Sequence, residues 1–204
     1  MPKTDYIQAN EYALKRLERE LPPNLVYHSL EHTRDEVVPM VKRLAEMEGV
    51  ESEDILLLET AAYFHDVGFV EQRDGHELNS IRIAKAVLPG FGFTTRQIKT
   101  ITDIIMATRI PQNPHTLLEE IIDDADLDSL GRTDYWERAQ ILRAELMAYG
   151  AHITDTEWCK LQKKLLHEHQ YFTASARLLR DAQKQKNIVA LLERCKPYLD
   201  DADP

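Results

Sequence analysis

Helical periodicity dominates the pattern of apolar and polar positions along the chain. Apolar residues recur at intervals of three and four, which places their side chains on one face of an α-helix. The first such stripe ends before a Pro-Pro pair and comprises Tyr6, Ala9, Ala13, Leu14 and Leu17. Strict alternation of apolar and polar residues, as in a half-buried β-strand, does not compete with this pattern. The pattern therefore predicts an all-α fold, a compact helical bundle.

Further segments with the same periodicity follow, and capping residues, glycines and prolines mark most of their ends. Ser52 is the expected N-cap of one helix, Thr94 or Thr95 that of another, and Pro39 should bend the helix that contains it. The acidic tail at 200–204 is expected to fray. The expected helical ranges are 30–48, 52–68, 80–87, 96–109, 116–131, 134–149, 155–184 and 187–195.

The length and apolar content of the chain indicate how many domains it forms. With 204 residues, 43% of them hydrophobic, we expect one domain over 1–204. No apolar run approaches the length of about 18 residues that suggests a membrane span, and the amino terminus lacks the apolar segment of a secretory signal. A cytoplasmic protein with no membrane partner is the expectation.

Charge and cysteine content narrow the partners further. The formal net charge of -10 argues against binding to long nucleic acid, because phosphate neutralisation requires a basic face. A small anionic ligand is still compatible with this charge, since one bound metal ion overrides the global field locally. Cys159 and Cys195 belong to no CxxC pattern, so we expect two free thiols and no disulfide.

A His-Asp doublet interrupts an apolar run, AAYFHDVGF, at residues 61–69. Burying an isolated carboxylate among such side chains carries a large desolvation cost, whereas a bound dication compensates it. His65 and Asp66 are therefore candidate metal ligands. On a continuous helix neighbouring side chains point about 100° apart, so both can reach one ion only if it lies near the edge between them.

Two further segments add groups of the same chemistry. In YHSLEHT, His28 and His32 are four residues apart and share a helical face, unless the helix begins only at Leu30 and leaves His28 on the preceding turn. The segment DDADLD, residues 123–128, is rich in carboxylates. Imidazole nitrogen and carboxylate oxygen together suit divalent transition metals.

The order of YHSLEHT, AAYFHDVGF and DDADLDSLG resembles the HD-domain superfamily of metal-dependent phosphohydrolases. The resemblance covers about 27–131 as the metal-site core, with C-terminal helices at about 134–195, and implies an all-α fold of the HD-domain type. It implies a divalent ion whose identity among Mn, Fe, Ni, Co, Zn and Mg stays open. The implied metal ligands are His32, His65, Asp66 and Asp126.

The choice of aspartate in the third segment rests on a partial match. Ala125-Asp126 agrees with the start of the A-D-x-L element of the family, although the leucine is shifted by one position. Asp124 is the alternative ligand and Asp128 a weaker one. Asp123 and Asp128 are expected to be solvated or to cap helix ends.

YHSLEHT also resembles the Y-H-x-x-x-H element of cyclic-nucleotide phosphodiesterases, which implies that His28 is the general acid. Asp66 would have a second, catalytic role in orienting the attacking water. His76, which follows the doublet, and Arg109, whose guanidinium pairs well with phosphate oxygens, are the expected substrate contacts. The resemblance leaves open that His76 is instead an extra metal ligand, as in family members that bind two metals. No histidine occupies the neighbourhood of Thr108, which favours one tightly bound ion over two.

These features predict a metal-dependent hydrolase, either a phosphodiesterase or a phosphatase. Its substrate would be a small phosphate mono- or diester, a nucleotide or cyclic nucleotide. The alternative is a non-catalytic regulatory module of the same fold that binds metal and nucleotide. A di-iron oxygenase-like protein is a third reading, which the missing histidine disfavours. The oligomeric state, a homo-oligomer included, stays open.

Overall fold

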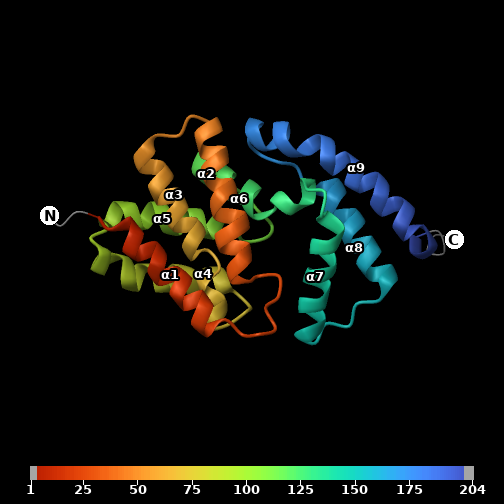
Figure 1. The fold of residues 1–204 in the computed structure, drawn as a ribbon, viewed down its shortest axis with the longest axis horizontal. Helices are drawn as coiled ribbons and strands as arrows, with labels where there is room; N and C mark the ends of the chain where they lie inside the picture. Colours follow the sequence, from red (N-terminus) through yellow and green to blue (C-terminus); the bar gives the residue numbers. More distant parts are fainter. Residues whose placement is uncertain (1–3, 200–204) are drawn as a thin grey trace. The chain divides into compact units, whose positions relative to one another are not determined.

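Every regular element of residues 4–199, the part of the chain that the computed structural model describes, is a helix (Figure 1). The predicted all-α fold is confirmed, and the tail at 200–204 lies outside the described residues. No helix in the described range is both long enough and apolar enough to cross a membrane. The α-helices are α1 (Tyr6–Glu20), α2 (Val38–Met47), α3 (Ser52–Phe64), α4 (His76–Val87), α5 (Thr95–Ala107), α6 (Leu117–Asp126), α7 (Tyr135–Ala148), α8 (Asp155–Glu168) and α9 (Ala174–Leu199).

Four short helical segments with a different winding join them. The segment η1 is a π-helix that runs directly into α2, and the other three are 3₁₀-helices. Pro39 lies in the first turn of α2, where the missing N–H is tolerated. The winding changes from π to α just before Pro39, close to where the sequence predicted a bend. The bounds are η1 (His32–Val37), η2 (Val67–Val70), η3 (Leu88–Phe91) and η4 (Asp128–Gly131).

The described residues form two compact units. Unit 1 contains 4–23 and 28–126, and unit 2 contains 24–27 and 127–199. All the predicted metal ligands belong to unit 1. A single domain over 1–204 stays a prediction.

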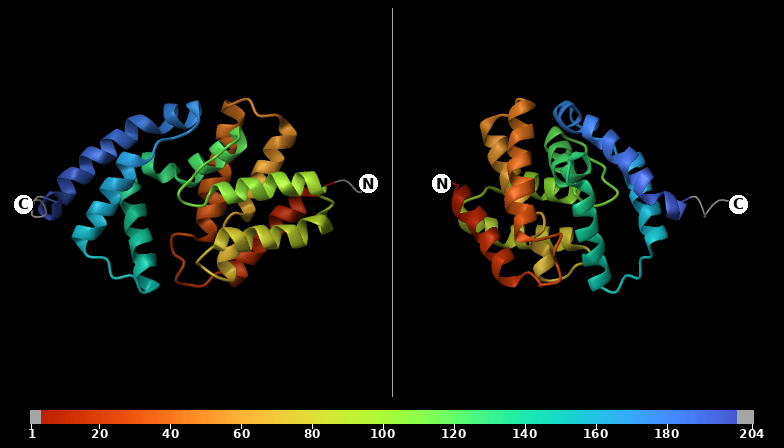
Figure 2. Two further views of the ribbon diagram at one scale, coloured as in Figure 1. Left: turned by 180° about the vertical axis from the view of Figure 1, so that it is seen from behind. Right: turned by 45° about the vertical axis from the view of Figure 1, so that its right-hand side comes forward.

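Unit 1 is built around α3, which packs against α1, α2 and α5 (Figure 2). The last turn of α3 carries the start of the apolar run found in the sequence, and Ala61, Ala62 and Phe64 there are buried. Its C-terminal end thus lies in the interior of the unit. The largest fully buried side chains of unit 1 include Leu44, Leu58, Phe64, Ile101, Ile105 and Ile121.

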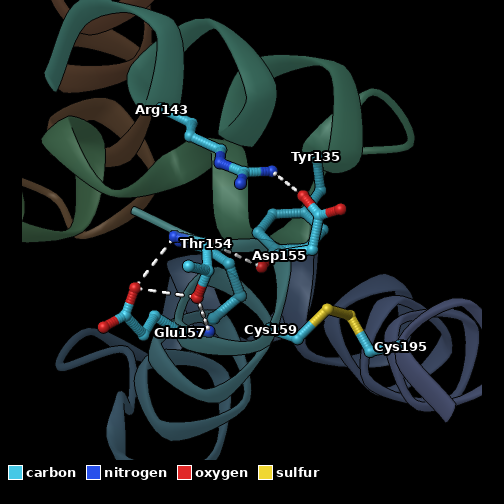
Figure 3. The surroundings of a disulfide bond; sticks show 8 residues. Tyr135, Arg143, Thr154, Asp155, Glu157, Cys159 and Cys195 are labelled. Carbon is cyan, nitrogen blue, oxygen red and sulfur yellow. Dashed lines mark hydrogen bonds and ion pairs between the residues drawn. A yellow bond between two sulfur atoms is a disulfide. The ribbon is translucent and has the colours of Figure 1, made fainter. Parts of the chain in front are cut away.

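Unit 2 contains a disulfide between Cys159 of α8 and Cys195 of α9 (Figure 3). The prediction of free thiols is therefore wrong. The two helices pack together and bring the cysteine Cα atoms to 5.7 Å, a separation suited to a disulfide. Spacing in the sequence does not reveal such a pair, because only helix packing brings it together. The surrounding core consists of Leu130, Tyr135, Ala139, Trp158, Leu166 and Leu191.

Capping residues hold the start of α8 beside the disulfide (Figure 3). The Thr154 hydroxyl accepts a hydrogen bond from the Glu157 N–H at 3.2 Å, and the Glu157 carboxylate accepts one from the Thr154 N–H at 2.8 Å. Arg143 of α7 forms an ion pair with Asp155 at 2.7 Å. Local hydrogen bonds thus determine where α8 begins.

Several helix ends differ from their predicted positions. The expected helices 155–184 and 187–195 are wrong, because the chain breaks at 169–173 and α9 then runs without interruption. His169 is extended, and the Thr173 hydroxyl accepts the Ala176 N–H at 3.1 Å to start α9. Thr94 is the N-cap of α5 as predicted, whereas Ser52 is the first residue of α3, one position after its N-cap.

Candidate metal centre

The His-Asp doublet lies where α3 stops. His65 is the C-cap of α3, and Asp66 has φ -99° and ψ 0°, after which the chain enters η2. Helix 52–68 is therefore shorter than predicted. Because the chain leaves the helix at Asp66, both side chains face the same point, with His65 Nε2 3.3 Å from Asp66 Oδ2. Both residues are buried.

The backbone around this helix end is held by α4. The Ser80 hydroxyl donates a hydrogen bond to the His65 carbonyl at 2.6 Å and accepts one from the Gly68 N–H at 2.7 Å. A Cβ atom on Gly68 would lie 1.9 Å from the His76 carbonyl oxygen, so only glycine permits this approach of α4 to η2. Because α4 begins at His76 rather than Ser80, His76 occupies the first helical turn instead of a loop.

His32 and Asp126 complete the cluster from two other elements. His32 comes from η1, and its Nδ1 lies 3.1 Å from a Glu36 carboxylate oxygen one turn further on. Its Nε2 lies 3.1 Å from Asp126 Oδ1 at the end of α6. Of the carboxylates considered in DDADLD, Asp126 thus has an oxygen beside the imidazoles. His65 Nε2 is 3.6 Å from that same oxygen.

Four donor atoms therefore converge: two imidazole nitrogens and two carboxylate oxygens. His32 Nε2 also lies 4.0 Å from Asp66 Oδ2, so donor atoms of His32, His65 and Asp66 all lie within 4.8 Å of one another, and Asp126 Oδ1 joins them through its contacts with the two imidazoles. Ligands about 2.1 Å from one ion are separated from one another by roughly 3.0–3.4 Å, so these distances approach those of a coordination shell. The donors are those that divalent Zn, Mn, Fe, Co and Ni accept.

Two buried atoms of the cluster support this assignment. His65 Nε2 and Asp66 Oδ2 have no hydrogen-bond partner within the described residues, and orphaned buried polar atoms are rare in folded proteins. His65 Nδ1 lies 2.7 Å from the Ala62 carbonyl oxygen, which requires a proton on Nδ1 and leaves the Nε2 lone pair for a ligand. Glu36 has the corresponding role at His32. The residues present therefore fit a divalent ion.

The same contacts shift the pKa values of the histidines and aspartates in the cluster. Burial lowers the pKa of His32, but hydrogen bonds to Asp126 and Glu36 outweigh it and raise the pKa to about 9. Burial raises the pKa of Asp66, yet the neighbouring His65 imidazolium lowers it well below its ordinary value. The site thus keeps its carboxylates ionised, and an entering cation would replace protons on the imidazoles.

The predicted acid and one predicted substrate contact lie beside this cluster. His76 Nε2 is 3.4 Å from Asp66 Oδ1, the oxygen that does not face His65. His28 lies in the bend before the helix, the second of its two predicted positions. Its ring centroid is 6.1 Å from that of His32 and 6.3 Å from that of His76.

Arg109 lies in a different hollow of unit 1. This surface hollow has a volume of about 560 Å³, and its lining includes Lys99, Met106, His115 and Glu119. None of the four converging donors lines it. The structure thus brings together His28, His32, His65, Asp66, His76 and Asp126, and it does not bring Arg109 into contact with them.

Several residues of the site and its surroundings escaped the sequence patterns. Glu36 was not predicted. The one sequence feature that could have identified it is its spacing of four residues from His32, which places both on one helical face. The prediction that Asp123 and Asp128 are solvated or capping is wrong, because both are buried. Asp128 forms an ion pair with Arg180 at 2.5 Å. Burial, together with the charges of Asp126, Asp124 and Glu119, raises the pKa of Asp123 to about 9, so its carboxyl is protonated at neutral pH.

Comparison with known proteins agrees with this geometry. A model of the HD-domain family matches residues 28–129. Solved structures with the same fold include Bacillus subtilis YpgQ in complex with ADP, with 19% identity, 94% of each chain covered and a TM-score of 0.67. A protein of Lactobacillus plantarum has 17% identity over 96% of this chain and 99% of its own, with a TM-score of 0.69.

A third structure, a predicted HD superfamily hydrolase from an uncultured Thermotogales bacterium, has 17% identity over 95% of this chain and 92% of its own, with a TM-score of 0.59. At these identities the structures show a shared fold alone. No protein with a curated description matches the chain. The family match spans half of the sequence and contains the His32, His-Asp and Asp126 segments. The chain therefore belongs to the HD-domain family.

Proposed function

We propose that the protein is a metal-dependent hydrolase of a small phosphate ester, with a nucleotide or cyclic nucleotide as its substrate class. One observation carries this proposal: two buried imidazole nitrogens and two carboxylate oxygens, from η1, the end of α3 and the end of α6, are linked by four nitrogen–oxygen contacts of 3.1 to 4.0 Å. Burying such a cluster carries a desolvation cost, and a bound divalent ion would offset it.

In this proposal His32, His65, Asp66 and Asp126 hold the divalent ion. When bound, such an ion supplies Lewis-acid polarisation of a phosphoryl oxygen and lowers the pKa of water from about 15.7 toward neutrality. Glu36 and the Ala62 carbonyl orient the two imidazoles so that each presents a lone pair. Asp66 Oδ1, which lies 3.4 Å from His76 Nε2, is the oxygen proposed to orient the attacking water.

His28 is the proposed proton donor to the departing oxygen. It lies in the bend before the helix, with its ring centroid 6.1 Å from that of His32 and 6.3 Å from that of His76. A histidine held within hydrogen-bond reach of a leaving alkoxide is well suited to this task near neutral pH. His76 and Arg109 are the proposed contacts to nonbridging phosphate oxygens. For Arg109 this role requires a substrate that extends into its hollow.

The substrate class rests on chemistry and on one relative. YpgQ, which shares the fold, has been solved with ADP, and this is consistent with a nucleotide ligand here. The net charge of -10 favours a small anion over a long polyanion. Whether the ester is a monoester or a diester is the first question for an activity panel.

The test is a panel of nucleotide mono- and diesters assayed with Mn²⁺, together with elemental analysis of the purified protein. His65→Ala and Asp66→Ala should lose both the bound metal and turnover, because each removes one of the four donors. His28→Ala should keep the metal while turnover falls by about 10²–10⁴-fold, the usual contribution of a general acid. His167→Ala, which changes an exposed histidine of unit 2, is the matched control and should change neither quantity.

The outcomes separate the competing readings. A His65→Ala variant that hydrolyses its substrate at the parental rate would contradict the proposal. Stoichiometric metal without turnover of any ester would instead identify the non-catalytic binding module. Two ions per chain would contradict the mononuclear site.

A further inference from the structure

Phe69 contacts two histidine rings at the edge of the candidate metal centre. Its ring is stacked on that of His76, with centroids 3.8 Å apart and planes 17° apart. It is also stacked on the ring of His28, with centroids 4.7 Å apart and planes 29° apart. Phe69 itself is 3% exposed, so its flat faces are covered by protein rather than by solvent.

The backbone attaches Phe69 to the doublet as well. The Phe69 N–H donates a hydrogen bond to the Asp66 carbonyl at 3.0 Å, which holds η2 directly after the candidate ligand. Gly68, the residue before Phe69, permits the close approach of His76 to the same segment. The position of the Phe69 ring relative to Asp66 is therefore determined by the fold and not by a free loop.

One of the two imidazoles stacked on Phe69 also contacts Asp66. His76 Nε2 approaches Asp66 Oδ1, the oxygen turned away from His65, while the His28 ring centroid lies 6.3 Å from that of His76. The contact with Asp66 holds one nitrogen of His76, and rotation of either imidazole about its side-chain torsions would move its nitrogens by several ångströms. A flat ring stacked on each imidazole opposes this rotation, and stacked aromatic pairs are favourable beyond the area that they bury.

We infer that Phe69 is a positioning residue: its ring holds the imidazoles of His28 and His76 toward the space beside Asp66 Oδ1 where the reacting phosphate binds. This inference rests on the proposed function. Phe69 acts through the two histidines and does not itself touch the ion or the phosphate. Its contribution is orientation, so it should affect kcat more than metal binding.

The test compares Phe69→Leu with Phe93→Leu in the manganese-loaded full-length protein. Both phenylalanines are buried in unit 1, but the ring partner of Phe93 is Tyr6, at 5.0 Å. Phe69→Leu should lower kcat at least tenfold with one metal ion per chain retained, and Phe69→Tyr, which keeps the ring, should restore kcat to within about threefold of the parent. Phe93→Leu should leave kcat unchanged.

A second measurement is independent of turnover. In the zinc-loaded protein, NMR should show the carbon-bound ring protons of His28 and His76 shifted by the ring current of Phe69. Phe69→Leu should remove these shifts and Phe93→Leu should preserve them. Parental kcat in Phe69→Leu, or unchanged histidine shifts in that variant, would overturn the inference. A parental protein that hydrolyses no phosphate ester would refute the proposed function instead, while the NMR comparison would still decide what Phe69 does to the two imidazoles.

Discussion

Reduction of the Cys159–Cys195 disulfide should destabilise unit 2 by an amount that follows from the chain it closes. The two residues are separated by 36 positions. In the chain-entropy model, a loop of that length loses roughly 13 cal/mol/K in the unfolded state, which corresponds to about 4 kcal/mol at 25 °C. Because a domain is typically stable by only about 5–15 kcal/mol, this is a large share of the stability of the unit.

Tryptophan fluorescence is a direct assay of this effect. Trp136 and Trp158 are the only two tryptophans of the chain, and both belong to unit 2. Urea unfolding of the parent, followed by fluorescence, should move to a lower midpoint when a reductant is added. Cys195→Ser should unfold at that lower midpoint with or without reductant, and so serves as the control for effects of the reductant itself.

Two results would refute this reasoning. The first is a parental midpoint that is the same in oxidising and reducing buffer. The second is two thiols that react with a thiol reagent in denatured protein never exposed to reductant. Structural disulfides persist mainly in oxidising compartments, so the redox state of this pair in intact cells also tests the predicted cytoplasmic location.

Three further changes have defined outcomes. Gly68→Ala should lower the free energy of unfolding by about 1–3 kcal/mol through a clash with the backbone of α4, whereas Gly90→Ala, with open space around it, should be neutral in the same urea titration. Glu36→Gln should weaken metal binding by about 10–100-fold in a chelator competition, because it weakens the orientation of the His32 imidazole; unchanged affinity would contradict this role. Asp123 has a pKa raised from 3.8 to about 9, so the folded state retains a proton that the unfolded state releases. Stability should therefore be full below about pH 4 and fall as the pH rises toward 9. Asp123→Asn should flatten this pH dependence in the metal-free protein and raise the free energy of unfolding by at most about 4 kcal/mol at pH 7. If the stability of parent and variant had the same dependence on pH, a raised pKa of Asp123 would be ruled out.

The sequence was informative where chemistry and periodicity coincide. Apolar stripes identified most of the helices. Thr94 marked the start of α5, because its hydroxyl accepts a hydrogen bond from a backbone N–H in the first turn of that helix. The candidate site was predictable in the same way, because His65-Asp66 has no physical reason to occupy an apolar run without a partner. These features depend on neighbours in the sequence.

The features that were missed depend on packing between distant segments. The pairing of Cys159 with Cys195 needs α8 to lie against α9, and the complete burial of Asp123 needs the neighbours of α6 in place. The end of α3 at Phe64 also lacks a local signal, since Gly68 lies four positions later. The periodicity of apolar residues along one sequence does not reveal which distant segments pack together.

The hydroxyl of Ser80 limits how α4 can move relative to the turn at His65–Gly68. A helix that stops inside a protein leaves peptide groups that water would otherwise satisfy, and here one oxygen of α4 serves a carbonyl and an amide of the His65–Gly68 turn. If α4 slid by one residue along its axis so that Ile81 replaced Ser80, both groups would lose their partner, because isoleucine has no polar side-chain atom. The position of α4 along its axis and the orientation of the His65-Asp66 doublet are therefore coupled through Ser80, and a change in one requires a change in the other.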